Sequence, residues 1–270
     1  MLNEIFLTAI VADAEAQKAR TILAGITEMR EQHHITKTRH LRRDLAVSGL
    51  PTIRQLQKGP AGPAGQKTPN AAAWQELHSA FLRQSYIIQR RLDITDDVLQ
   101  PASTGATGPV APPAAKIPYL RFTDVPDSVN PIDEPHTKRR ALEISDRRLD
   151  VILAENRFTV FNEYIEESYH WWQNDVEFAL TRYYLLPQTP STGPGNDPAA
   201  APKLSLDIME PLGDWWFLYA RVQVDSKPES LQEGHVKLRH VRHDLRGIFE
   251  FKVFDRRVHD TRNLGDKGPA

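Results

Sequence analysis

Residues 158–186 read FTVFNEYIEESYHWWQNDVEFALTRYYLL, and this stretch decides the fold. It contains two runs rich in aromatic and β-branched residues, which favour β-strands. The runs flank the trio Gln173-Asn174-Asp175, whose residue types form turns. We therefore predict two long antiparallel strands joined by this turn. Strands of that length favour a curled sheet or a closed barrel, because closure removes exposed strand edges.

The rest of the chain alternates between strand-like and helix-like patterns. Runs of β-forming residues predict further strands near 4–11, 33–44, 85–94, 117–123, 137–144, 215–224 and 248–253. Apolar residues at helical spacing predict three helices: at 14–29 after an Asp13 N-cap, after an Asn70 N-cap, and before Gly247. The fold class is α+β and mainly β: an antiparallel multi-strand β-barrel with a few packed helices and long disordered loops.

Three stretches rich in Pro, Gly, Ala and Ser interrupt these elements. They lie near 45–70, 97–116 and 188–203, and their composition predicts flexible insertions. The remaining residues are enough for one sizeable core. We expect a single barrel domain over 1–262, followed by a polar tail over 263–270.

Composition excludes several classes of function. Lys and Arg (34) balance Asp and Glu (35), whereas a protein that coats DNA carries a clear basic excess. The absence of cysteine excludes disulfides, thiolate zinc sites and cysteine nucleophiles. The chain starts without a signal-peptide pattern and contains no apolar run of about 18 residues, so we expect a soluble intracellular protein.

Two tryptophan doublets stand out, Trp171-Trp172 and Trp215-Trp216. Adjacent residues of a strand point to opposite faces, so one member of each doublet can fill a core. The other member is then covered by a helix of the same chain, covered by a partner, or left exposed. Aromatic residues are enriched at protein interfaces, which keeps the partner alternative open.

Candidate catalytic and metal-binding side chains do not form a recognisable site. Metal-binding glutamates in a barrel share the inward face, which requires positions i and i+2 on one strand. No such tight pair occurs among the acids of the hairpin: Glu163, Glu166, Glu167, Asp175 and Glu177. His240 and His243 lie three apart on the last predicted helix without an evident third ligand. We therefore predict no catalytic residue, no metal and no cofactor.

The last predicted helix also carries many basic residues opposite its leucines. They are Lys237, Arg239, His240, Arg242, His243 and Arg246. A basic helix can contact phosphates or an acidic partner. Because acidic residues elsewhere balance the charge, we interpret this face as solvated.

Several segments together resemble the family of Mediator complex subunit 18, particularly its fungal branch. They are Glu4–Val11, Ile22–Gly25, Trp74–Leu77, Arg83–Ile87, Phe178–Tyr183 and Asp255–Arg262. The resemblance covers most of the chain outside the three insertions, and it lies in the order of the segments rather than in any one of them.

The resemblance implies a barrel like that of the triphosphate-tunnel enzymes, placed in the Mediator head module in the nucleus. It implies pairing with Mediator subunit 20 and binding of a C-terminal helix of Mediator subunit 8. It further implies a coactivator that links regulators to RNA polymerase II and its initiation factors, without a membrane or sequence-specific nucleic-acid partner. We expect the partner-binding residues among the outward aromatics around Trp171–Tyr184 and Trp215–Tyr219: Trp171, Trp172, Phe178, Tyr183, Trp215 and Trp216.

The same barrel likeness makes a metal-dependent RNA or polyphosphate triphosphatase the main alternative. Enzymes of that type carry Glu-x-Glu-x-Lys on an early strand. This chain has Glu4-Ile5-Phe6-Leu7-Thr8 there, without the second glutamate and without the lysine. The sequence therefore favours a non-catalytic protein that holds partners. Direct nucleic-acid binding, the third class, would show affinity falling steeply with salt.

Overall fold

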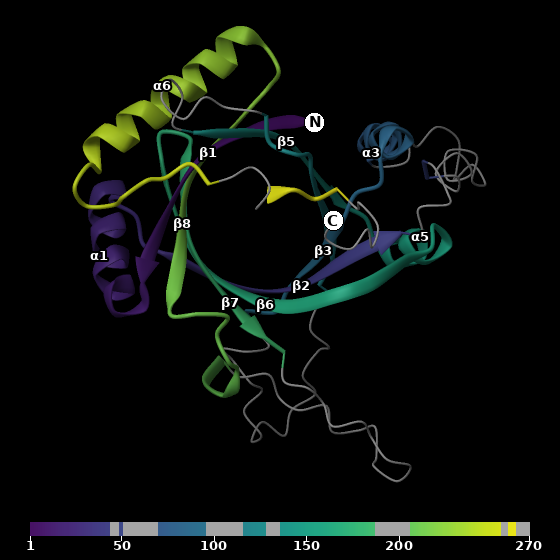
Figure 1. Cartoon of the computed structure of the whole chain (residues 1–270), viewed down its shortest axis with the longest axis horizontal. Helices are drawn as coiled ribbons and strands as arrows, with labels where there is room; N and C mark the ends of the chain where they lie inside the picture. The colour runs from purple at the N-terminus through teal and green to yellow at the C-terminus, as the bar shows by residue number, and fades with distance from the viewer. Residues whose placement is uncertain are drawn as a thin grey trace, which may run out of the picture.

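A computed structural model describes residues 1–43, 49–50, 70–95, 116–127, 136–186, 206–254 and 259–262. Its centre is a closed barrel of antiparallel strands in the order β1-β5-β4-β3-β2-β6-β7-β8 (Figure 1). The predicted fold class, a mainly β α+β barrel, is confirmed. The predicted insertions and the polar tail lie outside the described residues, apart from residues 49, 50, 70 and 116.

The strands are β1 Leu2–Ala12, β2 Gln32–Arg43, β3 Ile88–Asp93, β4 Tyr119–Thr123, β5 Thr137–Ser145, β6 Phe158–Gln173, β7 Val176–Leu185 and β8 Trp215–Val224. The α-helices are α1 Ala16–Thr27, α3 Ala71–Arg83, α5 Leu149–Glu155 and α6 Pro228–Asp244, with 3-10 turns at Asp13–Glu15 and Leu206–Ile208. All of the strands in this set and three of the four helices lie where the sequence predicts them. The short helix α5 was not predicted. In the part of the chain that the structure describes, no helix has the length and apolarity to cross a membrane.

The hairpin of β6 and β7 is confirmed. Gln173 pairs with Val176, so Asn174 and Asp175 form a two-residue turn. Both turn residues have positive φ, 48° and 65°. This conformation matches the right-handed twist of the strands, and Asn and Asp adopt it more readily than most residues.

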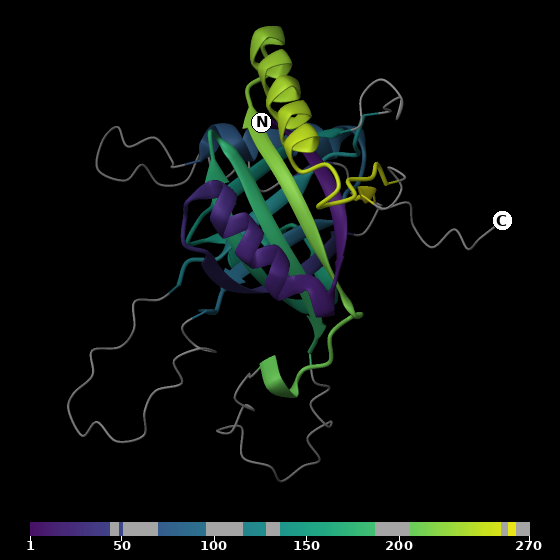
Figure 2. The same cartoon turned by 90° about the vertical axis from the view of Figure 1, so that its left-hand side faces the viewer.

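The apolar core lies outside the barrel, between the strands and the helices. Along β1, Ile5 and Leu7 point outward into this core, whereas Glu4 and Thr8 line the interior. Helices α1 and α6 cover the outer face of β1, β6, β7 and β8, and Leu238 of α6 is fully buried there (Figures 1 and 2). Helices α3 and α5 cover a second apolar cluster on the opposite side.

Neither of the two predicted N-cap side chains forms a capping hydrogen bond with its helix. Asp13 does not cap α1, because its Oδ1 accepts hydrogen bonds from Trp216 Nε1 and Arg182 Nη1, each at 2.8 Å. Asn70 occupies the N-cap position of α3, but its side chain donates to the Ser145 carbonyl at 2.5 Å instead. Each side chain therefore forms its hydrogen bond with a barrel strand and not with the backbone of its own helix.

The predicted closing strand at 248–253 was also wrong, since it is reduced to one bridge between Lys252 and Thr8. Strand β5 pairs with β1 only as far as Phe6, which leaves the Thr8 carbonyl free to accept from Lys252 N at 2.8 Å. The chain then leaves this edge and reaches β3 and β4, where Ile87 N donates to the Thr261 carbonyl at 2.6 Å. Figure 1 shows this C-terminal segment in yellow across the mouth of the barrel.

Candidate functional site

The barrel encloses a cavity of about 830 Å³ whose lining combines charged side chains with aromatic ones. The charged lining residues of the strands include four arginines and four glutamates: Arg91, Arg121, Arg139, Arg221, Glu4, Glu143, Glu166 and Glu177. They reach the cavity because strand residues alternate between the two faces of the sheet. A cavity of this size with converging polar groups is the first place to examine for function.

Glu4 is the centre of the interior network. Its carboxylate is fully buried and accepts hydrogen bonds from Arg121 Nη2 and Arg139 Nε, both at 2.6 Å. Arg221 Nη1 lies 3.5 Å from the same carboxylate. Burial alone would raise the pKa of Glu4, but the three arginines hold it well below its usual value. Glu4 is therefore ionised throughout the neutral range.

The remaining interior charges are also paired. Glu177 accepts two hydrogen bonds from Arg221, at 2.5 and 2.7 Å, and contacts His170 Nδ1 at 2.7 Å. Arg91 Nη2 lies 2.7 Å from Glu166, and Arg121 also donates to Glu143. The protein's own carboxylates thus neutralise the arginines of the cavity.

We expect stability to fall at acidic pH through Glu177. Burial would raise its pKa, yet His170 and Arg221 lower it to about 2 from the ordinary 4.5. Because the pKa is depressed in the folded state, the stabilisation is complete above pH 4.5 and is lost as pH falls through 2. A shift of this size corresponds to roughly 3 kcal/mol.

Urea unfolding of wild type and Glu177→Gln, followed by circular dichroism at pH 7, 4 and 2, measures this effect. The variant should be less stable by about 2–3 kcal/mol at pH 7 and equal to wild type near pH 2. Glu233→Gln is the control, because its carboxylate is exposed and pairs only with Lys237 among the described residues. If the difference in unfolding free energy between wild type and Glu177→Gln stays constant with pH, ionisation of Glu177 is not the cause of the pH dependence.

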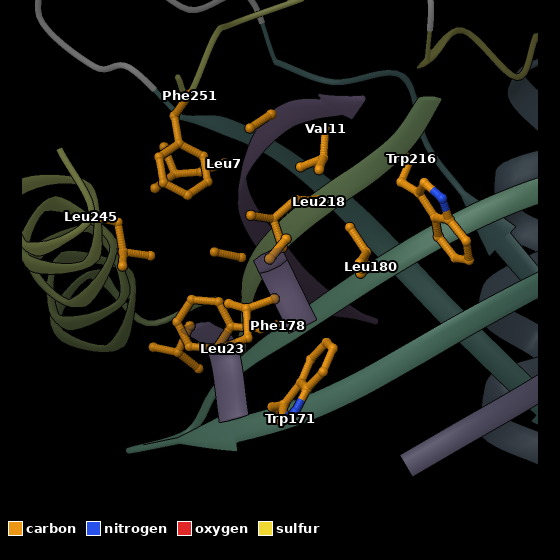
Figure 3. Packing of buried hydrophobic residues seen from close by; sticks show 14 of the residues in the cluster. Leu7, Val11, Leu23, Trp171, Phe178, Leu180, Trp216, Leu218, Leu245 and Phe251 are labelled. Carbon is orange, nitrogen blue, oxygen red and sulfur yellow. The ribbon is translucent and has the colours of Figure 1, made fainter. Parts of the chain in front are cut away.

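Three of the predicted partner-binding aromatics are buried within the chain. Trp171, Phe178 and Trp216 pack in the apolar cluster on the outer face of the barrel, with Leu23 of α1 and Leu245 beyond α6 (Figure 3). Trp171 and Trp216 are therefore the members of the two tryptophan doublets that fill the core.

The other three aromatics line the cavity. Trp172 stacks on His170 with ring centroids 5.9 Å apart, and Tyr183 packs edge-on against Tyr164 at 5.3 Å. Trp215 lies where β8 begins and is 45% exposed. Contacts within the chain account for the other five aromatics, while partner contact stays a prediction and Trp215 is the member of the set best placed to make it.

The acids of the hairpin are dispersed rather than gathered. Glu166 and Glu177 line the cavity, as does Glu4, but Glu163 pairs with Arg39 and Glu167 accepts from Tyr184 on the outer face. His240 and His243 are exposed on α6. Over the described ranges no group of three or more His, Asp or Glu side chains could hold a metal ion.

The four interior arginines were missed by the sequence reasoning. A signal for them existed in β4, where the single Arg121 stands between Leu120 and Phe122. A charged residue inside an apolar strand run marks a face that is not part of the apolar core.

The chain was compared with known proteins. The family model described as Med18 protein matches residues 3–262. No curated protein sequence matches the chain. A chain in the structure of the Schizosaccharomyces pombe Mediator head module is 10% identical, with a TM-score of 0.57 over 93% of this chain and 98% of that one.

Two structures from Pyrococcus horikoshii OT3 were also matched. The PH1819 protein is 10% identical, with a TM-score of 0.44 over 93% of this chain and 94% of that one. The PH1012 protein is 12% identical, with a TM-score of 0.42 over 93% and 96%. Family membership rests on the model match, which spans nearly every residue of the barrel. The chain therefore belongs to the Med18 family.

Proposed function

We propose that this chain is a non-catalytic scaffold subunit of the Mediator head module in the nucleus. In this proposal it pairs with Mediator subunit 20 and holds a helix of Mediator subunit 8. The assembly then links regulators to RNA polymerase II and its initiation factors. The observation that carries the proposal is the Med18 family match over residues 3–262.

The interior chemistry supports a non-catalytic role. A triphosphate ligand needs cations that are free to neutralise it, whereas these arginines already pair with Glu4, Glu166 and Glu177. On β1 the cavity-facing residues are Glu4, Phe6, Thr8 and Ile10. Phe6 and Thr8 thus stand at the positions where the tunnel enzymes carry a second glutamate and a lysine. We therefore place the triphosphatase alternative second.

Co-expression tests the scaffold function. We expect the full chain to co-purify with Mediator subunits 20 and 8 as a stoichiometric complex, whose mass in light scattering equals one copy of each. The chain expressed alone is the reference. A chain that stays alone in the presence of both subunits would contradict the proposal.

An enzymatic assay accompanies the binding experiment. Inorganic tripolyphosphate with Mg²⁺ or Mn²⁺ should show no hydrolysis above the buffer rate. Metal-dependent release of phosphate that disappears in Glu4→Gln would establish the triphosphatase instead. Binding to DNA or RNA that weakens steeply between low and moderate salt would favour the nucleic-acid class.

A further inference from the structure

Four exposed apolar side chains form an arc at one mouth of the barrel, which we call the rim. They are Ile10 of β1, Leu185 of β7, Leu212 just before β8 and Trp215 of β8, exposed by 53, 45, 49 and 45%. Strands β1, β8 and β7 are neighbours in the sheet, so the rim crosses adjacent strands. Large apolar side chains that gather at one place on a surface mark an interaction site more often than scattered ones do.

The backbone holds the rim in place. Before β8 begins, the chain runs antiparallel to the end of β7. Leu212 N donates to the Tyr183 carbonyl at 2.8 Å, and Leu185 N donates to the Glu210 carbonyl at 3.0 Å. Ala12 pairs with Trp215 across β1 and β8. Figure 2 shows this approach to β8 at the lower edge of the barrel, away from α6.

Gly213 lets the Trp215 ring lie over the backbone. A Cβ atom at Gly213 would stand only 2.4–2.6 Å from three ring carbons of Trp215, so no larger residue fits beneath the ring as it lies. The indole thus packs over the backbone at Gly213 and is 45% exposed at the mouth. A side chain that is ordered before binding loses little conformational entropy when a partner covers it.

Two acidic side chains beside the rim have no ion-pair partner in the described part of the chain. Glu210 and Asp214 are both exposed, and neither forms an ion pair with another described residue. The neighbouring Asp13, by contrast, is held by Arg182 at 2.8 Å. A partner that covers the rim therefore meets two carboxylates that this part of the chain does not neutralise.

We propose that the rim binds one amphipathic helix of a partner protein, with its apolar stripe on Leu212 and Trp215 and with Lys or Arg beside Glu210 and Asp214. The inference rests on the proposed scaffold function and assigns it a surface. Three adjacent strands span about 10–15 Å, which matches two to three turns of a helix. An apolar helix face laid on an apolar surface of its partner is a common mode of recognition.

Two variants and one control test the rim in the full chain. Leu212→Arg sets a cation against the expected basic helix, and Glu210→Lys/Asp214→Lys reverses the acidic charges. Val151→Arg is the control, because Val151 is 60% exposed on α5, on the other side of the barrel. Affinity for purified Mediator subunits 20 and 8 is measured by calorimetry at two salt concentrations, after circular dichroism confirms folding.

Leu212→Arg should weaken the complex by about 30-fold or more, as for a central apolar anchor. The charge-reversed double variant should weaken it about 10-fold and lose its salt dependence. The control should stay within about twofold of wild type. If wild type binds neither subunit, the scaffold function itself is contradicted. If wild type binds and both rim variants bind equally well, the rim is not the binding surface, and the scaffold function still stands.

Photo-crosslinking identifies the occupant. A benzoylphenylalanine in place of Leu212 should crosslink to a peptide with apolar residues at helical spacing and with Lys or Arg beside them. Crosslinks to a second copy of this chain, or to its own residues 187–205, would overturn the proposal.

Discussion

Glu4→Gln should lower the free energy of unfolding by about 3–5 kcal/mol, because removing one partner of a buried ion pair leaves uncompensated charge. Arg121 and Arg139 each lie 2.6 Å from this carboxylate, and Arg221 lies at 3.5 Å. The uncharged amide keeps the shape of the side chain but balances none of these cations. The loss is therefore electrostatic rather than a loss of packing.

Urea unfolding at pH 7 measures this loss. Glu143→Gln is the matched control, since the Glu143 carboxylate contacts the same Arg121 but its side chain is 48% exposed. Exposed pairs contribute about 0–1 kcal/mol, so the control should stay close to wild type. Equal effects of the two substitutions would show that the interior is solvated enough to screen Glu4.

Trp171→Ala and Trp215→Ala should separate folding from binding. Trp171 is fully buried under α1, and truncating such a side chain costs about 3–5 kcal/mol through lost transfer energy and the cavity that remains. Trp215 is half exposed, so its truncation should cost about 1 kcal/mol or less. Thermal unfolding by circular dichroism gives the two stabilities.

For partner binding, we expect Trp215→Ala to have the larger effect of the two substitutions. Trp215→Ala should weaken the complex with the Mediator subunits, whereas any effect of Trp171→Ala should follow its loss of folded protein. Measuring affinity at a temperature where both variants are folded removes that contribution. Trp215→Ala with full affinity would remove Trp215 from the interface.

The sequence predicts the strands well but not which side of the sheet is the core. Alternation in β6 shows that Trp171 and Trp172 point to opposite faces, and it says nothing about where those faces lie. In this barrel Trp171 meets α1 on the outside, while Trp172 meets His170 inside. Of the six aromatics expected to point outward, Trp172, Tyr183 and Trp215 line the interior instead, since only tertiary packing decides between helix cover and barrel interior.

The interior site is a long-range arrangement, which explains why local patterns miss it. Glu4 meets Arg121 and Arg221, which are more than one hundred residues away along the chain. No spacing rule on a single strand brings these three side chains together. Helix α5 was missed for a local reason, because its seven residues are too few to establish a helical period.

Barrel closure has a consequence for the newly made chain. Strand β1 pairs along its whole length with β8, from Asn3 with Val224 to Ala12 with Trp215. A ribosome adds about 5–20 residues per second, so the roughly 200 residues between the two strands take on the order of 10–40 s to appear. The segment Leu2–Ala12, β-forming and largely apolar, has both backbone edges unpaired until β5 is made, and the edge that pairs with β8 stays open until the end. We therefore expect the nascent N-terminus to need protection by a chaperone until β8 appears.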